Sequence, residues 1–161
     1  MSVTAGRNGA VKLQFPSADL GDPATTVTDI GTLNTSMNSA VVFGQVRSWS
    51  LEETVDTLDA TVMSSSTGFI FRDVLPSFKS WTASVDFIYD PADVNGQGNV
   101  YLKAGNTVNV GIFPEGDNAG DDVWGGKAMI TSISQSASFD GLVECTVSLD
   151  GRAVLVRGDN A

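Results

Sequence analysis

Carboxylates are the side chains of this 161-residue sequence best suited to chemistry. Glu52, Glu53, Asp56 and Asp59 lie close together, and two carboxylates on either side of a glycosidic bond suffice for hydrolysis. However, they lie along one expected strand, where successive side chains point to opposite faces. A two-carboxylate hydrolase would need a cleft around Glu52 or Asp56, and nothing in the pattern indicates one.

A second acidic group lies in a Gly/Asn-rich turn region. Asp117, Asn118, Asp121 and Asp122 offer oxygen ligands that would suit Ca²⁺. Their spacing lacks the regular alternation and the final glutamate of a calcium-binding loop. Turns of this composition are commonly solvated, so the pattern favours a solvated turn over a metal site.

Histidine is absent and Cys145 is the only cysteine. These two facts exclude a Ser-His-Asp triad, a Cys-His pair, a zinc finger and a disulfide framework. Gly125-Gly126-Lys127 fails as a phosphate loop, because Asp121 and Ala128 stand where glycine and Ser/Thr are required. We therefore expect no enzyme, no catalytic residue, no metal and no cofactor.

Charge limits the possible partners. The formal net charge is −10 and the sequence pI is about 4.1, which argues against an attractive surface for nucleic acid. No apolar run resembles the core of a signal peptide or reaches the roughly 20 residues of a membrane helix. The expectation is a chain made in a cytoplasm, without a membrane anchor.

Alternating apolar and polar residues indicate an all-β chain with frequent turns. The expected strands span residues 8–15, 43–63, 79–89 and 107–114, followed by a hairpin over 123–151. A tight turn is expected at Asp140-Gly141, and a short helix over 99–103. Six to eight strands in one domain predict an antiparallel β-sandwich or barrel.

Three segments interrupt the strands. Residues 16–42 read as a long surface loop or an extended hairpin, and residues 152–161 as a polar C-terminal arm. Residues 64–78 combine a serine run with several large apolar side chains, whose exposure to water would be costly. Such a segment either folds back on its own core or docks on a neighbouring subunit.

The hairpin over 123–151 has two unlike sides. Val143, Cys145, Val147 and Leu149 alternate with polar residues along the return strand, and serines alternate along the outgoing strand. One side is therefore apolar and the other is lined by hydroxyls and carboxylates. A smooth polar sheet face is unusual for a catalyst and suits passage or assembly.

Taken in order along the chain, these segments resemble the major tail tube proteins of long-tailed phages. The resemblance rests on TAGRNG (4–9), VRSWSL (46–51), DTLD (56–59), LP (75–76), KSW (79–81), FPEG (113–116), WGG (124–126), ITSIS (130–134) and SASFDG (136–141). Each motif is weak alone, but their order and spacing are specific. Residues 16–42 depart from the short members of the family.

The resemblance implies a β-sandwich with one short helix and a structural role. Such proteins form rings, usually hexameric, that stack into a hollow tube through which genomic DNA leaves the capsid without specific binding. Their inner strands close into one continuous barrel. The implied partners are further copies of the chain and the tape-measure, tail-terminator and baseplate or tip proteins. The implied location is the virion tail, assembled in the host cytoplasm.

Two sets of residues follow as hypotheses. The residues expected to face the lumen are Asp86, Ser132, Ser134, Glu144, Thr146, Ser148 and Asp150. The residues expected to bury against an adjacent subunit are Phe69, Ile70, Phe71 and Leu75. The alternative to a tail tube subunit is a ligand-binding or capsid-decorating β-sandwich module, which would be a discrete particle with a pocket.

Overall fold

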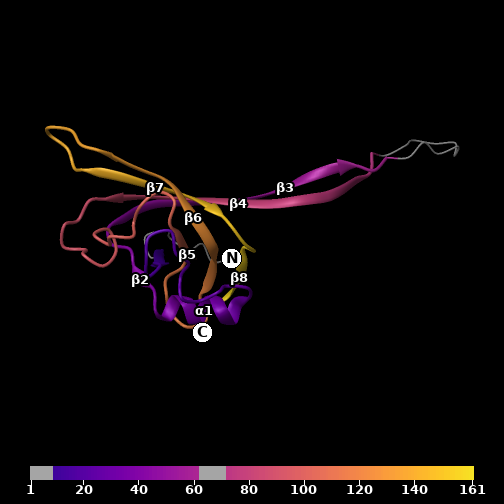
Figure 1. Cartoon of the computed structure of the whole chain (residues 1–161), viewed down its shortest axis with the longest axis horizontal. Coiled ribbons are helices and arrows are strands. Elements are labelled where there is room, and N and C mark those ends of the chain that lie inside the picture. The colour runs from indigo at the N-terminus through magenta and orange to yellow at the C-terminus, as the bar shows by residue number, and fades with distance from the viewer. Residues whose placement is uncertain (1–8, 62–71) are drawn as a thin grey trace, which may run out of the picture.

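The computed structural model describes residues 9–61 and 72–161. Within them the elements are β1 (Ala10–Gln14), α1 (Ile30–Asn38), β2 (Val41–Val42), β3 (Val46–Asp59), β4 (Val74–Ile88), β5 (Thr107–Phe113), β6 (Asp122–Ser136), β7 (Glu144–Gly151) and β8 (Val156–Asp159). All strand pairs are antiparallel, in the order β2-β1-β5-β6-β7-β4-β3, and β8 pairs with β6. The expected all-β fold with one short helix is confirmed (Figure 1).

Strand β6 belongs to two layers. Its first half lies between β5 and β8, and its second half pairs with β7. The pairing register shifts between Ile130 and Ser132, which leaves Thr131 as an extra residue. Bulges of this kind bend a strand. The sheet therefore folds over itself at β6, with β3, β4, β7 and the end of β6 in one layer and the remaining strands in the other.

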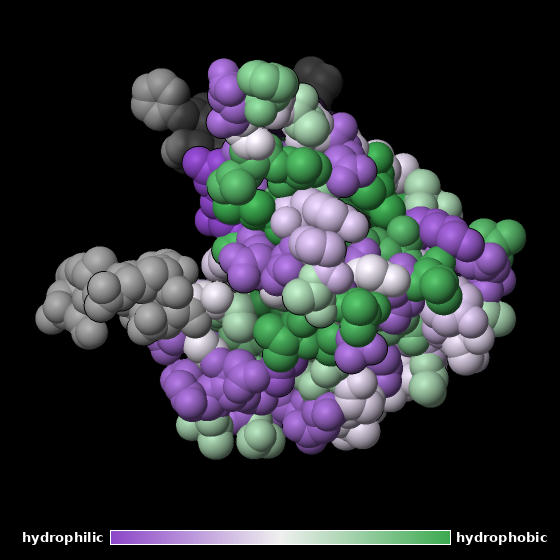
Figure 2. Space-filling model, turned by 90° about the vertical axis from the view of Figure 1, so that its left-hand side faces the viewer, coloured by the Kyte–Doolittle hydropathy of each residue, from purple (hydrophilic) through white to green (hydrophobic). Residues whose placement is uncertain are grey.

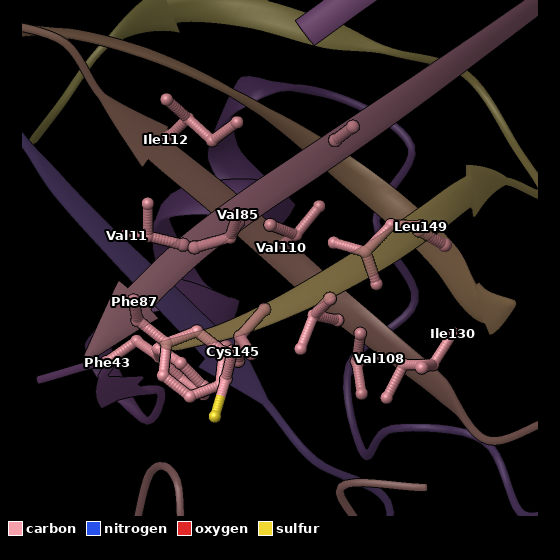
Figure 3. Packing of buried hydrophobic residues seen from close by; sticks show 14 of the residues in the cluster. Val11, Phe43, Val85, Phe87, Val108, Val110, Ile112, Ile130, Cys145 and Leu149 are labelled. Atoms are coloured by element: carbon pink, nitrogen blue, oxygen red, sulfur yellow. The ribbon is translucent and has the colours of Figure 1, made fainter. Parts of the chain in front are cut away.

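The main core fills the space between these layers. Alternate residues of β4 and β7, including Val85, Phe87, Val147 and Leu149, pack against Val110 and its neighbours from the second layer (Figure 3). Phe43 meets the Phe87 ring edge-on, with centroids 4.6 Å apart. Burying side chains of this size contributes roughly 1.5–3 kcal/mol each. The same alternation turns the intervening polar residues of β4 and β7 away from the core.

Helix α1 covers the other face of the second layer. Asp29 caps its N-terminus by accepting a hydrogen bond from the Thr32 backbone N–H at 2.8 Å, while the Thr32 side chain accepts one from the Asp29 N–H. Leu33 and Met37 are buried one helical turn apart against Phe113. The glycine at 111 leaves room for Met37, because a Cβ there would collide with its side chain.

The single helix is therefore not where the sequence pattern placed it. Residues 16–42, expected to be a loop or extended hairpin, contain α1 and β2, whereas residues 99–103 form turns. The many serines, threonines and asparagines of α1 obscure its apolar spacing. The C-terminal segment 152–161, expected to be an arm, contains β8, which is paired with β6.

Two hairpins leave the body of the molecule at opposite ends (Figure 1). One consists of β3 and β4, and the other of β6 and β7. The tight turn expected at Asp140-Gly141 is wrong, because Ser136 pairs with Glu144 and residues 137–143 form the connection. This register centres the hairpin on Asp140. A two-residue turn would need a one-residue slip, which would move every buried residue of one strand to the wrong face.

Candidate functional site: the polar face of the β3-β4-β7-β6 layer

The face of this layer that points away from the core is polar on all four strands. Residues paired across antiparallel strands lie on the same face. One row runs Ser48–Asp86–Thr146–Ser134, the next runs Ser50–Ser84–Ser148–Ser132, and a third runs Glu52–Thr82–Asp150. We call this surface, together with Glu144, the polar face.

The structure brings all seven residues expected to face a lumen onto this one surface. They contribute the β6 and β7 parts of the rows and Asp86 from β4, and Glu144 extends the surface toward the β6–β7 connection. Sequence reasoning missed the residues that complete the face, which are Ser48, Ser50, Glu52, Thr82 and Ser84. Their period-two alternation was visible in the sequence, but the register that sets Ser48, Ser50 and Glu52 beside β4 was not.

Asp86 is the most constrained carboxylate of the polar face. Its oxygens accept hydrogen bonds from Thr146 Oγ1 at 2.6 Å and from Ser48 Oγ at 2.8 Å. These bonds, the Thr146 bond first, lower the pKa of Asp86 below its usual value. The carboxylate therefore stays ionised at neutral pH and ties β3, β4 and β7 together on their polar side.

The cations of the molecule are largely neutralised within the chain. Of the eight lysines and arginines among the described residues, seven form ion pairs: Lys12, Arg47, Arg72, Lys79, Lys103, Lys127 and Arg157. On the polar face, Arg47 pairs with Glu144. Neither Glu52 nor Asp150 has an ion pair in the described part of the chain, so the polar face carries uncompensated negative charge.

The carboxylates considered for hydrolysis are not arranged as an acid and a nucleophile. Alternation places Glu52 on the polar face and Glu53 on the other side, where Glu53 pairs with Lys79 at 3.0 Å. Hydrogen bonds from Thr61 lower the pKa of Asp59, the opposite of what a general acid requires. These geometries give no support to a hydrolase.

The acidic turn is also engaged internally. Asp117 pairs with Lys12, Asp122 pairs with Arg157, and Asp121 accepts a hydrogen bond from Asn118. Over residues 9–61 and 72–161, no group of three or more acidic or cysteine side chains is placed to hold a metal ion.

Cys145 is buried, and burial raises the pKa of its thiol. In the same ranges no helix is long and apolar enough to cross a membrane.

The residues expected at a subunit contact lie on or beyond the β3–β4 hairpin. Phe69, Ile70 and Phe71 fall outside the described residues. Leu75 lies opposite Leu58, and both are more than half exposed, at 53% and 59%. The described part of this hairpin therefore carries exposed apolar side chains.

Both outer edges of the polar layer are open within the described residues. β3 pairs with β4 alone, so its other edge has no partner strand. On β6, pairing with β5 ends at Met129, and the far side of residues 132–136 is likewise unpaired. Open strand edges of this length are pairing sites for another chain.

Solved structures that share this fold include chains from a particle tail, a tail tube and a baseplate. A chain from the tail of an empty gene transfer agent particle, computed with C6 symmetry, aligns with a TM-score of 0.64 at 16% identity over 95% of this chain and 97% of that one. The SPP1 tail tube protein aligns with a TM-score of 0.59 at 14% identity, over 98% of this chain and 80% of that one. A chain of the six-fold symmetrised anti-feeding prophage baseplate aligns with a TM-score of 0.55 at 10% identity, over 99% of each chain.

No protein-family model matches this sequence, and no curated protein matches it significantly. The likeness is thus one of fold. It extends over nearly the whole chain and defines the class as the tail tube fold, as the sequence motifs predicted.

Proposed function

We propose that this chain is the structural subunit of a phage-type tail tube. In this proposal six copies form a ring, the rings stack, and the polar face lines the lumen through which DNA passes. The likeness to tail and baseplate chains solved with six-fold symmetry supports the ring. The one-sided polarity of the β3-β4-β7-β6 layer supports the placement of the lumen.

The observation that carries the proposal is a layer with one polar face and two open edges. If the β3 edge of one subunit pairs with the β6 edge of the next, the layers of all subunits join into one closed barrel. Closure removes both open edges of the polar layer, which a single subunit cannot do. The polar rows then continue from subunit to subunit around the ring.

The charge of the face suits passage rather than binding. Six copies carry a formal charge of 6 × −10 = −60. Lysines and arginines would bind the phosphate backbone by releasing its counterions, whereas carboxylates repel it. Screening limits this repulsion to about 10 Å at 0.1 M salt, so the carboxylates of the polar face are the ones that act on passing DNA.

The remaining contacts of the proposal lie outside the barrel. Leu75, with Phe69, Ile70 and Phe71, buries against an adjacent subunit. The tape-measure, tail-terminator and baseplate or tip proteins bind the completed tube. Assembly takes place in the host cytoplasm, and the tube resides in the virion tail.

Negative-stain electron microscopy of the purified full-length chain tests this function. We expect rings or long hollow fibres under polymerising conditions, with six-fold rotational averages. A monodisperse monomer or small oligomer at every concentration and salt would contradict the proposal. It would favour a ligand-binding or capsid-decorating module instead.

A further inference from the structure

The connection between β6 and β7 ends in an apolar tip. Phe139 is fully exposed and Leu142 is 67% exposed, while the neighbouring carboxylate of Asp140 has no ion pair among the described residues. The base of this tip is fixed, because the Tyr89 N–H donates to the Val143 carbonyl at 2.9 Å. Figure 2 looks onto this end of the molecule, where hydrophobic patches are separated by hydrophilic residues.

A cavity of about 390 Å³ lies at the other end of β7, at the root of the β3–β4 hairpin. Its apolar lining includes Trp81, Val154 and Leu155, and its charged lining includes Lys79, Glu53 and Arg152. Trp81 is held in place, because its Nε1–H donates to the Ala153 carbonyl at 2.8 Å. The cavity therefore has a fixed aromatic wall beside an exposed valine.

Arg152 distinguishes this cavity electrostatically. It is the one lysine or arginine of the described ranges without a carboxylate partner, and its side chain donates only to Thr107 Oγ1, at 2.9 Å. A guanidinium carries five N–H donors in a rigid fork that matches a carboxylate. Arg152 thus keeps donors for an acid that arrives from elsewhere.

We propose that the Phe139–Leu142 tip of one subunit inserts into this cavity on a second copy, with Asp140 pairing to Arg152. The two surfaces match in kind. The tip offers an aromatic and a leucine beside a carboxylate without an ion pair, and the cavity offers apolar side chains beside a guanidinium that lacks a carboxylate partner in the described ranges. They cannot meet within one chain, because they lie at opposite ends of β7, about 25 Å apart at 3.2–3.4 Å per residue.

This inference rests on the proposed tube and names one of its ring-to-ring contacts. A tip that fits a distant cavity makes a head-to-tail contact, and contacts of this type generate open, repeating assemblies. A single tip is a small anchor, since one aromatic side chain buries about 150–250 Å². Each subunit of a ring would contribute one tip to the next ring. Because these contacts form together, contacts of modest strength give a large combined affinity.

A charge exchange tests the pairing. Asp140→Arg and Arg152→Glu each place like charges together, so we expect each to reduce tube length at least tenfold while rings or protomers remain. The double variant restores the opposite charges and should restore growth. Phe139→Ser should shorten tubes in the same way. Val94→Ser, a substitution of another exposed apolar residue on the β4–β5 connection, is the matched control and should leave growth unchanged.

Cross-linking tests the contact in a form that does not depend on loss of function. Asp140→Cys combined with Val154→Cys should give a ladder of disulfide-linked chains when tubes are oxidised, and neither single substitution should. The inference is wrong if Asp140→Arg and Arg152→Glu form tubes as long as those of the wild type. It is also wrong if the double cysteine variant forms tubes without a ladder of linked chains. Neither result would contradict the proposed tube. If growth is lost on substitution of Val154 but not of Phe139, another segment occupies the cavity and the inference is wrong. Failure of the wild-type chain to form tubes would instead overturn the proposed function.

Discussion

Serine, threonine and amide side chains are concentrated in two regions of this molecule, one buried and one at the surface. Between α1 and the second layer, Gln14, Ser36 and Asn109 are buried and hydrogen-bonded to one another. On the polar face, Ser50, Ser84 and their neighbours stand in rows at the surface. The buried residues hold a helix on a sheet, whereas the surface rows lie on the side of the layer that faces away from the core.

The difference lies in what each region loses when a partner is removed. A buried polar group left without a partner costs about 1–3 kcal/mol, because its desolvation is no longer offset. A hydroxyl that faces water has no such penalty. Similar chemistry is therefore structural in one region and replaceable in the other, which leaves the polar face free to meet functional demands.

The largest expected effect is in the buried network. Gln14 Oε1 accepts from Ser36 Oγ at 2.7 Å and from Asn109 Nδ2 at 2.8 Å, and its Nε2 donates to Ser39 Oγ at 2.7 Å. Gln14→Met keeps the shape and removes these bonds, so the free energy of unfolding should fall by about 2–4 kcal/mol. Urea denaturation measures this change.

The same substitution at Gln135 is the matched control, because that glutamine is exposed near the end of β6. Gln135→Met should change the free energy of unfolding by less than about 0.5 kcal/mol. Equal losses at positions 14 and 135 would contradict the claim that burial makes the network around Gln14 structural.

A smaller effect is expected at Asp86, where the polar face does carry a structural bond. Since the pKa of Asp86 is lowered in the folded chain, its stabilisation is present above its usual value of 3.8 and is lost as the pH falls through the folded-state pKa. Thr146→Val removes the main hydrogen bond to Asp86. The variant should be less stable than the wild type at pH 7.

The stability difference should disappear at a pH low enough to protonate Asp86 in both states. Denaturation at a series of pH values measures this convergence, with Thr35→Val on the exposed side of α1 as the comparison. A Thr146→Val deficit that stays constant into strong acid would assign the loss to packing rather than to the carboxylate.

The smallest stability effect is expected at Ser84. Ser84→Lys should change the free energy of unfolding by less than about 0.5 kcal/mol, as is usual for surface substitutions. In a tube it should nevertheless retain duplex DNA in a salt-dependent way, because each lumen lysine releases counterions from phosphates. Co-sedimentation of DNA with the tubes measures this retention.

Thr35→Lys places the same charge on the exposed face of α1, on the opposite side of the molecule. If tubes of Thr35→Lys retain as much DNA as tubes of Ser84→Lys, the polar face does not line the lumen. Comparing the DNA retained by the two variants therefore shows whether the polar face or the α1 side lines the lumen.

The sequence was informative where one simple period decided the structure. Alternation in β4 and β7 predicted the strands, their buried side and the carboxylates of the polar face, because burial of Val85 and Val147 leaves no other arrangement. Ser48 was not predicted as the partner of Asp86, because its position follows from cross-strand register. The β3–β4 register shifts between Val46 and Ser48, at a position that no local pattern marks.

Helix α1 shows a second reason why prediction from sequence was incomplete. Asp29 and Thr32 cap its N-terminus, but its buried residues include Asn34 and Ser36, which resemble loop residues until their partners are known. Asn34 Nδ2 donates to the Asp159 carbonyl at 3.1 Å, and Ser36 belongs to the network around Gln14. These partners lie 125 and 22 residues away in the sequence, so tertiary contacts supply what propensity does not.

The path of β6 through both layers has a mechanical consequence. Because one strand forms part of the polar layer and part of the layer under α1, the two cannot slide past each other without breaking its hydrogen bonds to β5, β7 and β8. Each subunit therefore behaves as a stiff block. In the proposed tube, bending would therefore take place at the contacts between subunits, and the lumen would keep its width along the curve.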